Sequence, residues 1–209
     1  MTSHRRTQRK RTAASGPGSG SVRIIGGEWR GRRLPVADAP GLRPSGDRAR
    51  ETLFNWLQPH LQGARCADLF AGSGSLGFEA ASRGAREVCL IERSRPLAVM
   101  LSESAQLLQA GQIEVVNADA LEWLKGRPPS SLDIVFIDPP FETDLAQRAL
   151  EKLAETGCLA PGALVYLESP RRDQVVPPQG FVWVREKGIG EVRLELFEWS
   201  LRYNVRPFD

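Results

Sequence analysis

The pattern of apolar and polar positions changes near Arg65. From there, short apolar runs of strand length alternate with segments in which apolar residues recur at helical spacing. The runs predicted as strands are 66–70, 87–91, 113–116, 134–137 and 163–167, and the helical segments between them are 75–83, 96–110, 120–125 and 145–156. This alternation predicts a mostly parallel sheet with helices on both faces.

The last part of the chain shows a different pattern. Residues 181–187 and 192–200 alternate apolar with polar positions on either side of Gly188-Ile189-Gly190. Such alternation around a glycine turn is typical of two antiparallel strands. We therefore expect the sheet to end in an antiparallel pair rather than in another strand–helix unit.

The first 62 residues predict a smaller appendage. Residues 22–25 and 32–36 are short strand candidates, and the glycines between them permit a hairpin. Asp47 is predicted to cap a helix that runs to about Leu61. Residues 1–21 are basic and then rich in Gly, Ser and Pro, so we predict a disordered tail there, an appendage over 22–62 and one main domain over 63–209.

A glycine-rich turn follows the first strand of the main domain. Gly72-Ser73-Gly74-Ser75-Leu76-Gly77 has the G-x-G-x-x-G spacing that lets a backbone turn tightly against a ligand. Glu92 ends the next strand, where a carboxylate can accept both hydroxyls of a ribose. The pattern alone fits any adenosine-containing cofactor, and it also occurs in turns that serve only packing.

Three further carboxylates decide between the adenosine cofactors. Asp68 at the end of the first strand would repel a pyrophosphate and suits a cationic amine, and Asp119 after the third strand can accept from an adenine amino group. Asp138 ends the fourth strand. Parallel strands bind ligands at their carboxyl ends, so four acids on consecutive strands favour one shared site for S-adenosylmethionine, although any single acid could be a helix cap.

The residues Asp138-Pro139-Pro140-Phe141 indicate the chemistry. A carboxylate and a backbone carbonyl, stiffened by two prolines, are suited to accept the two N–H groups of an exocyclic amine. Phe141 can stack on the base that carries this amine. The purely structural alternative is a Pro-Pro turn with an acidic cap and a phenylalanine in the core.

Composition excludes several classes of function and places the charge at one end. Only two histidines occur and no P-loop, so we expect neither a metal site nor a histidine-based triad. No apolar stretch is long enough to span a membrane, and the three cysteines lack metal-ligand spacing, as in a cytoplasmic protein. Residues 1–50 hold twelve Arg and Lys against three Asp and Glu, which predicts a polyanionic partner gripped at that end.

With these motifs assembled, the chain resembles class I S-adenosylmethionine-dependent methyltransferases, and more closely the small single-domain bacterial 16S rRNA guanine-N2 methyltransferases. Residues 43–57, 68–77 and 138–141 carry the resemblance, which extends from about Val22 to Trp199. Ser45 and Ala49 depart mildly from the family pattern. The resemblance implies a Rossmann-like, seven-stranded sheet with an antiparallel last strand, and a cytoplasmic monomer that methylates one guanine in the small ribosomal subunit.

Three groups of site residues are predicted. The catalytic group is Asp138, Pro139 and Phe141. The cofactor group is Asp68, Phe70, Ala71, Gly72, Ser73, Gly74, Glu92, Arg93, Asp119 and Ala120. The RNA-binding group is Arg23, Arg30, Arg32, Arg33, Arg43 and Arg48.

Other functions stay open on the residues alone. The same amine chemistry serves DNA adenine-N6 methyltransferases, although this chain has little room for the recognition domain that such enzymes use. A methyltransferase acting on glutamine amides commonly starts the motif with asparagine, where this chain has Asp138. A non-enzymatic alternative is an rRNA-binding assembly factor with a vestigial cofactor site.

Overall fold

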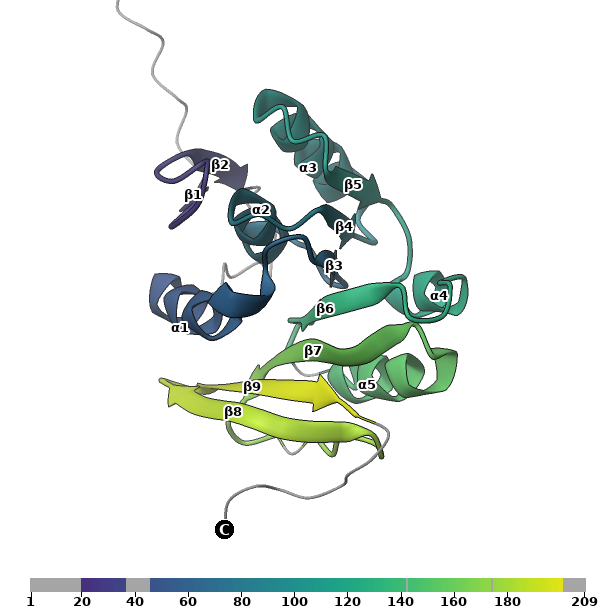
Figure 1. Ribbon diagram of the computed structural model, residues 1–209. Coiled ribbons are helices and arrows are strands. Elements are labelled where there is room, and N and C mark those ends of the chain that lie inside the picture. The colour runs from purple at the N-terminus through teal and green to yellow at the C-terminus, as the bar shows by residue number, and fades with distance from the viewer. Residues whose placement is uncertain (1–19, 37–45, 142, 174, 201–209) are drawn as a thin grey trace, which may run out of the picture.

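The computed structural model describes residues 20–36, 46–141, 143–173 and 175–200. Strands in these ranges form a two-stranded sheet in the order β1-β2 and a seven-stranded sheet in the order β5-β4-β3-β6-β7-β9-β8. The strands are β1 (Gly20–Arg23), β2 (Arg33–Val36), β3 (Arg65–Asp68), β4 (Glu87–Ile91), β5 (Ile113–Val116), β6 (Leu132–Ile137), β7 (Leu159–Pro170), β8 (Phe181–Ile189) and β9 (Val192–Trp199). Figure 1 shows the large sheet running through the whole molecule.

The large sheet confirms the predicted topology. Strands β5, β4, β3, β6 and β7 pair in parallel, and β9 pairs antiparallel with both β7 and β8. The strand order reverses between β3 and β6, which are neighbours although two strands separate them along the chain. This arrangement is a doubly wound α/β sheet, whose ligands bind at the carboxyl ends of the strands. We call that side of the sheet the carboxyl edge.

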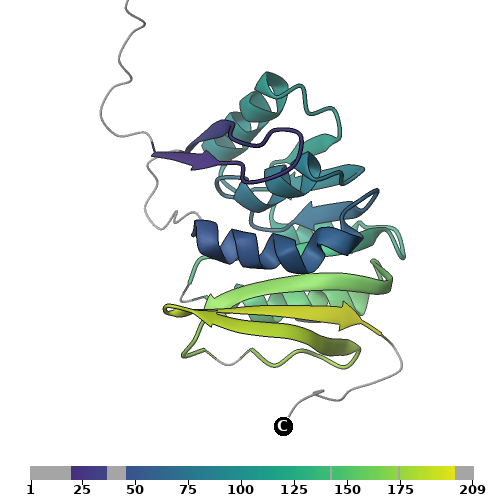
Figure 2. The same ribbon diagram turned by 60° about the vertical axis from the view of Figure 1, so that its left-hand side comes forward.

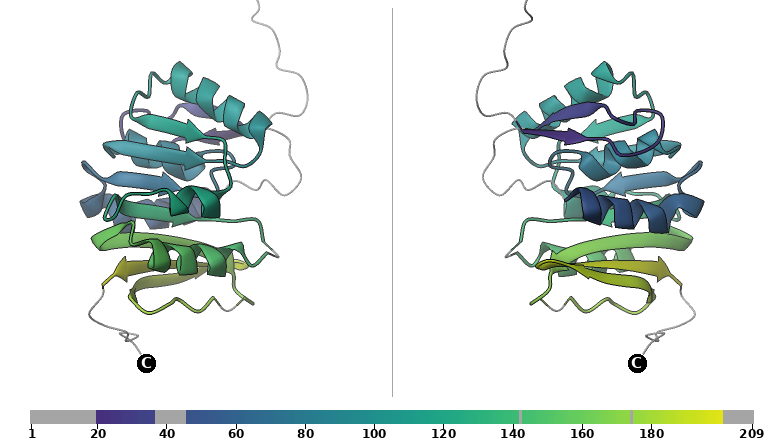
Figure 3. Two further views of the ribbon diagram at one scale, coloured as in Figure 1. Left: turned by 90° about the vertical axis from the view of Figure 1, so that its right-hand side faces the viewer. Right: turned by 90° about the vertical axis from the view of Figure 1, so that its left-hand side faces the viewer.

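Helices cover both faces of the sheet, as expected. The helices are α1 (Asp47–Leu57), α2 (Ser75–Ser82), α3 (Arg95–Leu107), α4 (Ala120–Lys125) and α5 (Leu145–Thr156). One core cluster joins α1, α2 and α3 to one face, and a second joins α4 and α5 to the other. The two opposite views of Figure 3 show these layers, and Figure 2 shows α1 lying along the sheet between the β1–β2 hairpin and the β8–β9 end.

The sequence misplaced some boundaries and one cap. Gly46, not Asp47, is the N-cap of α1, and Asp47 is the first helical residue, where its carboxylate accepts from Arg50. The helix ends at Leu57 and a 3-10 turn follows over Gln58–His60, because Pro59 lacks the N–H that an α-helix needs. Strand β7 extends beyond the predicted 163–167 at both ends, because Leu159 pairs with Leu132 of β6 and the residues up to Pro170 pair with β9.

Strand β1 begins at Gly20, two residues inside the stretch predicted as a disordered tail. The rest of that predicted tail lies outside the described residues. Within the described ranges, no helix is long and apolar enough to cross a membrane.

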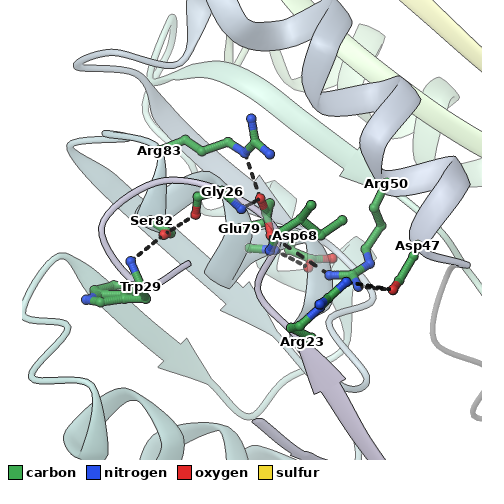
Figure 4. Close-up of polar contacts among 11 residues, drawn as sticks. Arg23, Gly26, Trp29, Asp47, Arg50, Asp68, Glu79, Ser82 and Arg83 are labelled. Atoms are coloured by element: carbon green, nitrogen blue, oxygen red, sulfur yellow. Dashed lines mark hydrogen bonds and ion pairs between the residues drawn. The ribbon is translucent and has the colours of Figure 1, made fainter. Parts of the chain in front are cut away.

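Polar contacts dock the N-terminal hairpin onto α2. The buried carboxylate of Glu79 accepts the backbone N–H groups of Ile25 and Gly26 at 2.7 and 2.8 Å. Ser82 Oγ accepts from the Trp29 N–H and donates to the Gly26 carbonyl. We call these contacts the hairpin junction, and Figure 4 shows them converging on α2. They fix the hairpin against the helix that starts at the glycine-rich turn.

Candidate active site

The two signature motifs of the sequence meet at the carboxyl edge. In the β3–β6 pairing, Asp68 lies opposite Phe136, and Asp138 follows two residues later. The backbone N–H of Leu69 continues this contact by donating to the Phe136 carbonyl at 3.1 Å. The glycine-rich turn after β3 and the Asp-Pro-Pro-Phe segment after β6 therefore leave the sheet side by side.

The glycine-rich turn has the backbone conformation that only glycine adopts easily. Gly72 and Gly74 have φ angles of 50° and 75°, and Gly74 is the N-cap of α2. A Cβ atom on Gly74 would lie 2.6 Å from the Phe78 ring and 2.7 Å from Leu101. The turn is consequently fixed by packing on its inner side, and the α2 N–H groups begin directly behind it.

Asp68 is a buried acid with an unused hydrogen-bonding atom. Only 2% of the residue is exposed, and Oδ2 accepts the Gly77 backbone N–H at 3.1 Å. Its Oδ1 has no hydrogen-bond donor among the described residues. Burial raises the pKa of Asp68 to about 7, against the lowering effects of the Gly77 and Phe70 backbone N–H groups. A cationic group placed against this carboxyl would supply the missing partner and favour its ionised form.

Glu92 connects the glycine-rich turn to the next helix. One carboxylate oxygen accepts the Gly72 N–H at 2.9 Å and the other accepts the Ser94 N–H at 2.7 Å. The residue is half-buried, and each oxygen keeps a second lone pair for a ligand. Glu92 thus has a structural role in this fold, and its contact with ribose remains a prediction.

Asp119 is the N-cap of α4, which is the purely structural role that any single acid at a strand end could have. Its Oδ1 accepts the N–H groups of Leu121 and Glu122 at 2.9 and 3.2 Å. Ala120, the first helical residue, is buried. The capping bonds occupy one oxygen and orient the carboxylate at the carboxyl end of β5. Contact of Asp119 and Ala120 with adenine stays a prediction.

The Asp-Pro-Pro-Phe segment projects from the end of β6. Asp138 is half-buried, Pro139 is buried and Phe141 is 41% exposed. The Thr143 hydroxyl donates to the Pro140 carbonyl at 2.8 Å and closes the turn. Phe141 packs into neither core cluster and its ring is exposed beside a carboxylate. This contradicts the alternative in which Phe141 is a core residue of a purely structural turn.

The remaining predicted site residues differ in their exposure to solvent. Phe70 is half-buried, whereas Ala71 and Ser73 are buried in the glycine-rich turn. Arg93 is exposed, and its backbone carbonyl accepts from Asn117. The RNA-binding candidates Arg23, Arg30, Arg32, Arg33 and Arg48 are all exposed. Arg43 lies outside the described residues.

The structure adds residues that the sequence did not single out. Asn117 donates through Nδ2 to the Glu92 and Arg93 carbonyls, so it ties the ends of β4 and β5 together. Tyr166 and Glu168 lie on β7 next to Asp138 and are hydrogen-bonded to each other at 2.8 Å. Tyr166 and Glu168 are two residues apart and follow the apolar run 163–165, and polar groups at such positions of a buried strand could have been recognised in the sequence.

The residues of the carboxyl edge fit S-adenosylmethionine. Asp68, whose Oδ1 has no donor among the described residues, would hold its ammonium group, and the half-buried acids Glu92 and Asp119, which follow β4 and β5, would hold its adenosine. The glycine-rich turn leaves room for a ligand to approach the backbone. When bound, this cofactor supplies a methyl group already activated by a sulfonium.

Fold and site together define a class I S-adenosylmethionine-dependent methyltransferase. A sequence model of the family described as "Conserved hypothetical protein 95" matches residues 22–198. The protein named "Ribosomal RNA small subunit methyltransferase D" from Haemophilus influenzae is 45% identical over 86% of this chain and 94% of its own length. Its namesake from Escherichia coli K12 is 47% identical over 87% of this chain and 91% of its own length. The chain belongs to this family of methyltransferases.

Solved structures agree with the assignment. A putative methyltransferase from Escherichia coli superposes with a TM-score of 0.81 at 42% identity and covers 88% of this chain and 100% of its own. A Thermus thermophilus 16S rRNA methyltransferase, described in complex with AdoMet and guanosine, has a TM-score of 0.65 at 23% identity over 87% of this chain and 50% of its own. At that identity the second match supports the fold alone.

Proposed function

We propose that this enzyme transfers the methyl group of S-adenosylmethionine to the exocyclic N2 amine of one guanine in 16S rRNA. The observation that carries the proposal is the β3–β6 pairing, which puts Asp68 and Asp138 on neighbouring strands at the carboxyl edge. The relatives named as small-subunit rRNA methyltransferases support the choice of RNA over DNA. The substrate we propose is the assembled small subunit, bound by a cytoplasmic monomer.

The chain's own residues make a weak nucleophile reactive. The lone pair of an exocyclic amine is delocalised into the base, so the amine must be positioned and its charge stabilised. The Asp138 carboxylate and the Pro139 carbonyl accept its two N–H bonds, which lets the nitrogen become tetrahedral as positive charge develops there. Pro139 and Pro140 lack N–H donors and have a fixed φ, so no backbone donor competes for the acceptors. The exposed ring of Phe141 stacks on the base.

The exposed arginines of the hairpin are proposed to hold the RNA. Arg30, Arg32 and Arg33 lie on or beside the β1–β2 hairpin, and Arg48 lies in the first turn of α1. The hairpin junction fixes this basic surface relative to α2 and hence to the glycine-rich turn. Phosphate contacts there would position a large substrate without reading its sequence.

Tritium transfer tests the proposal. Labelled S-adenosylmethionine is incubated with the enzyme and purified small subunits, naked rRNA or duplex DNA. We expect label in 16S rRNA, and mass mapping should place it on one guanine as N2-methylguanine. Label in DNA alone, in a protein band, or on a ring nitrogen would overturn the assignment. Tight particle binding without cofactor binding in calorimetry would favour the assembly-factor alternative.

A further inference from the structure

A second carboxylate lies beside Asp138 on the neighbouring strand. In the parallel β6–β7 pairing, Phe136 lies opposite Tyr166 and Ile137 opposite Leu167. Asp138 is the first residue after β6, and the same register continued by one position brings it next to Glu168 on β7. Side chains alternate between the faces of a strand, so Asp138 and Glu168 share the face to which Phe136 and Tyr166 contribute their rings.

Tyr166 holds Glu168 in place. The fully buried phenol donates to Glu168 Oε2 at 2.8 Å, and Glu168 itself is 5% exposed. Burial raises the pKa of Tyr166 well above its usual value, and the charges of Glu168 and Asp138 raise it further. The phenol therefore stays protonated and remains a hydrogen-bond donor to Glu168.

The chemistry of guanine explains why two carboxylates would stand side by side. Guanine presents two adjacent donors on its pairing edge, the N2 amine and the N1–H. Adenine presents an amine next to N1, which carries no hydrogen and is an acceptor. A second carboxylate next to the one that grips the amine matches guanine and repels adenine, because an unprotonated acceptor would face the N1 lone pair.

We propose that Glu168 is a specificity-determining residue that accepts the N1–H of the target guanine while Asp138 and the Pro139 carbonyl hold its amine. The inference rests on the proposed function and adds how the base is chosen. A carboxylate has about four lone-pair positions, so Glu168 can accept from the Tyr166 hydroxyl and from a substrate donor at the same time. Tyr166 acts through Glu168 as a positioning residue. The exposed Phe141 ring covers the base from one side, and Glu168 reads its edge.

A purine analogue tests the proposal without any variant. 2-Aminopurine keeps the 2-amine of guanine, but its N1 is an acceptor without hydrogen. The full-length enzyme is given small subunits reconstituted with either guanine or 2-aminopurine at the target position. We expect the wild type to prefer guanine in kcat/KM by roughly 10²-fold or more, because a site built to bind an N–H leaves a buried acceptor unpaired when that donor is missing. Equal rates on the two purines would overturn the inference.

Glu168→Gln sharpens the test. The amide keeps an oxygen for the Tyr166 hydroxyl and gains an NH₂ that can donate to the bare N1 of 2-aminopurine. We expect a lower kcat/KM on guanine and a preference reduced to about tenfold or less, with unchanged affinity for S-adenosylmethionine. An equal loss on both purines would show that Glu168 has only a structural role, and would also overturn the inference.

Glu195→Gln is the matched control. Glu195 is a buried carboxylate on β9, 1% exposed, and it accepts from Trp183 Nε1 at 3.1 Å. It lies opposite Leu167, on the other face of the sheet. The preference for guanine should therefore stay at the wild-type value. If instead the wild type transfers no methyl group to guanine-containing particles, the proposed function fails, a result distinct from any change in preference.

Discussion

Two buried carboxylates on the same face of the sheet have opposite surroundings. Glu79 in the hairpin junction is fully buried and accepts two backbone N–H groups and the Arg83 guanidinium at 2.7 Å. Asp68 at the carboxyl edge is almost as buried, yet its Oδ2 accepts the Gly77 N–H while its Oδ1 has no donor among the described residues. A buried acid is costly unless it is paired. The satisfied acid holds the hairpin against α2, and we infer that the unsatisfied acid marks where the cofactor binds.

The largest effect, a loss of folding stability, is expected from replacing Glu79, the acid whose hydrogen bonds are satisfied. Glu79→Ala removes the acceptor of two backbone N–H groups and leaves the buried Arg50, among the described residues, with its 2.6 Å contact to Asp47 alone. Uncompensated buried charge costs about 3–5 kcal/mol, so the free energy of unfolding in urea should fall by that amount. Glu122→Ala removes an exposed ion pair with Lys125 and should cost under about 1 kcal/mol. Similar losses for the two variants would contradict the comparison.

The unsatisfied acid should affect ligand binding rather than folding. Asp68→Asn removes a charge-assisted bond to the cofactor ammonium, which is worth about 1.5–3 kcal/mol. Calorimetry should show S-adenosylmethionine binding weakened by roughly 10- to 100-fold with no loss of stability. An unchanged dissociation constant would mean that Asp68 does not face the cofactor.

The same acid makes cofactor binding depend on pH. Burial raises the pKa of Asp68 to about 7 in the free enzyme, and the cation prefers the ionised carboxylate. Affinity should therefore rise roughly tenfold between pH 5.5 and pH 7, as the fraction of ionised Asp68 rises. The rise should be absent in Asp68→Asn, and its persistence there would assign the titration to another group.

Phe141 tests the exposed side of the carboxyl edge. Stacking of a base on an aromatic ring is worth about 1–3 kcal/mol, so Phe141→Ala should lower kcat/KM for the RNA substrate by roughly 5- to 150-fold. Phe141→Tyr keeps the ring and should retain most activity. Val176→Ala, at a residue 67% exposed, removes an apolar side chain elsewhere on the surface and should have no effect.

The smallest effect per substitution is expected for the hairpin arginines, as a modest loss of affinity for the ribosomal particle. Replacing Arg30, Arg32 and Arg33 singly by Gln should weaken particle binding modestly and lower the slope of the salt dependence by about one for each phosphate that is no longer neutralised. Arg185→Gln is the control, because Arg185 is exposed on β8, the last strand of the large sheet and the end that lies away from the β1–β2 hairpin (Figure 1). Equal effects of Arg185→Gln and the hairpin variants would show that net charge alone sets affinity.

Local patterns in the sequence predicted the sheet, the glycine-rich turn and the position of four acids at or just after the carboxyl ends of its parallel strands. They could do so because strand period, glycine spacing and the rule for parallel strand ends need no tertiary information. The hairpin junction could not be predicted, because Glu79 and Ile25 are 54 positions apart and meet only through packing. Asp119 illustrates an intermediate case, since its position predicted both a ligand group and the cap that the structure shows.

The proposed mechanism assigns separate roles to the ends of β3 and β6: the end of β3 binds the cofactor, and the segment after β6 holds the amine of the target base. Asp138→Ala tests it directly, with single-turnover methyl transfer and calorimetric titration of S-adenosylmethionine measured on the same preparation. We predict that transfer falls by about 10²-fold or more while the cofactor dissociation constant changes by less than about tenfold. Parallel loss of cofactor binding and transfer would contradict the account, because Asp138 would then serve the cofactor rather than the target base.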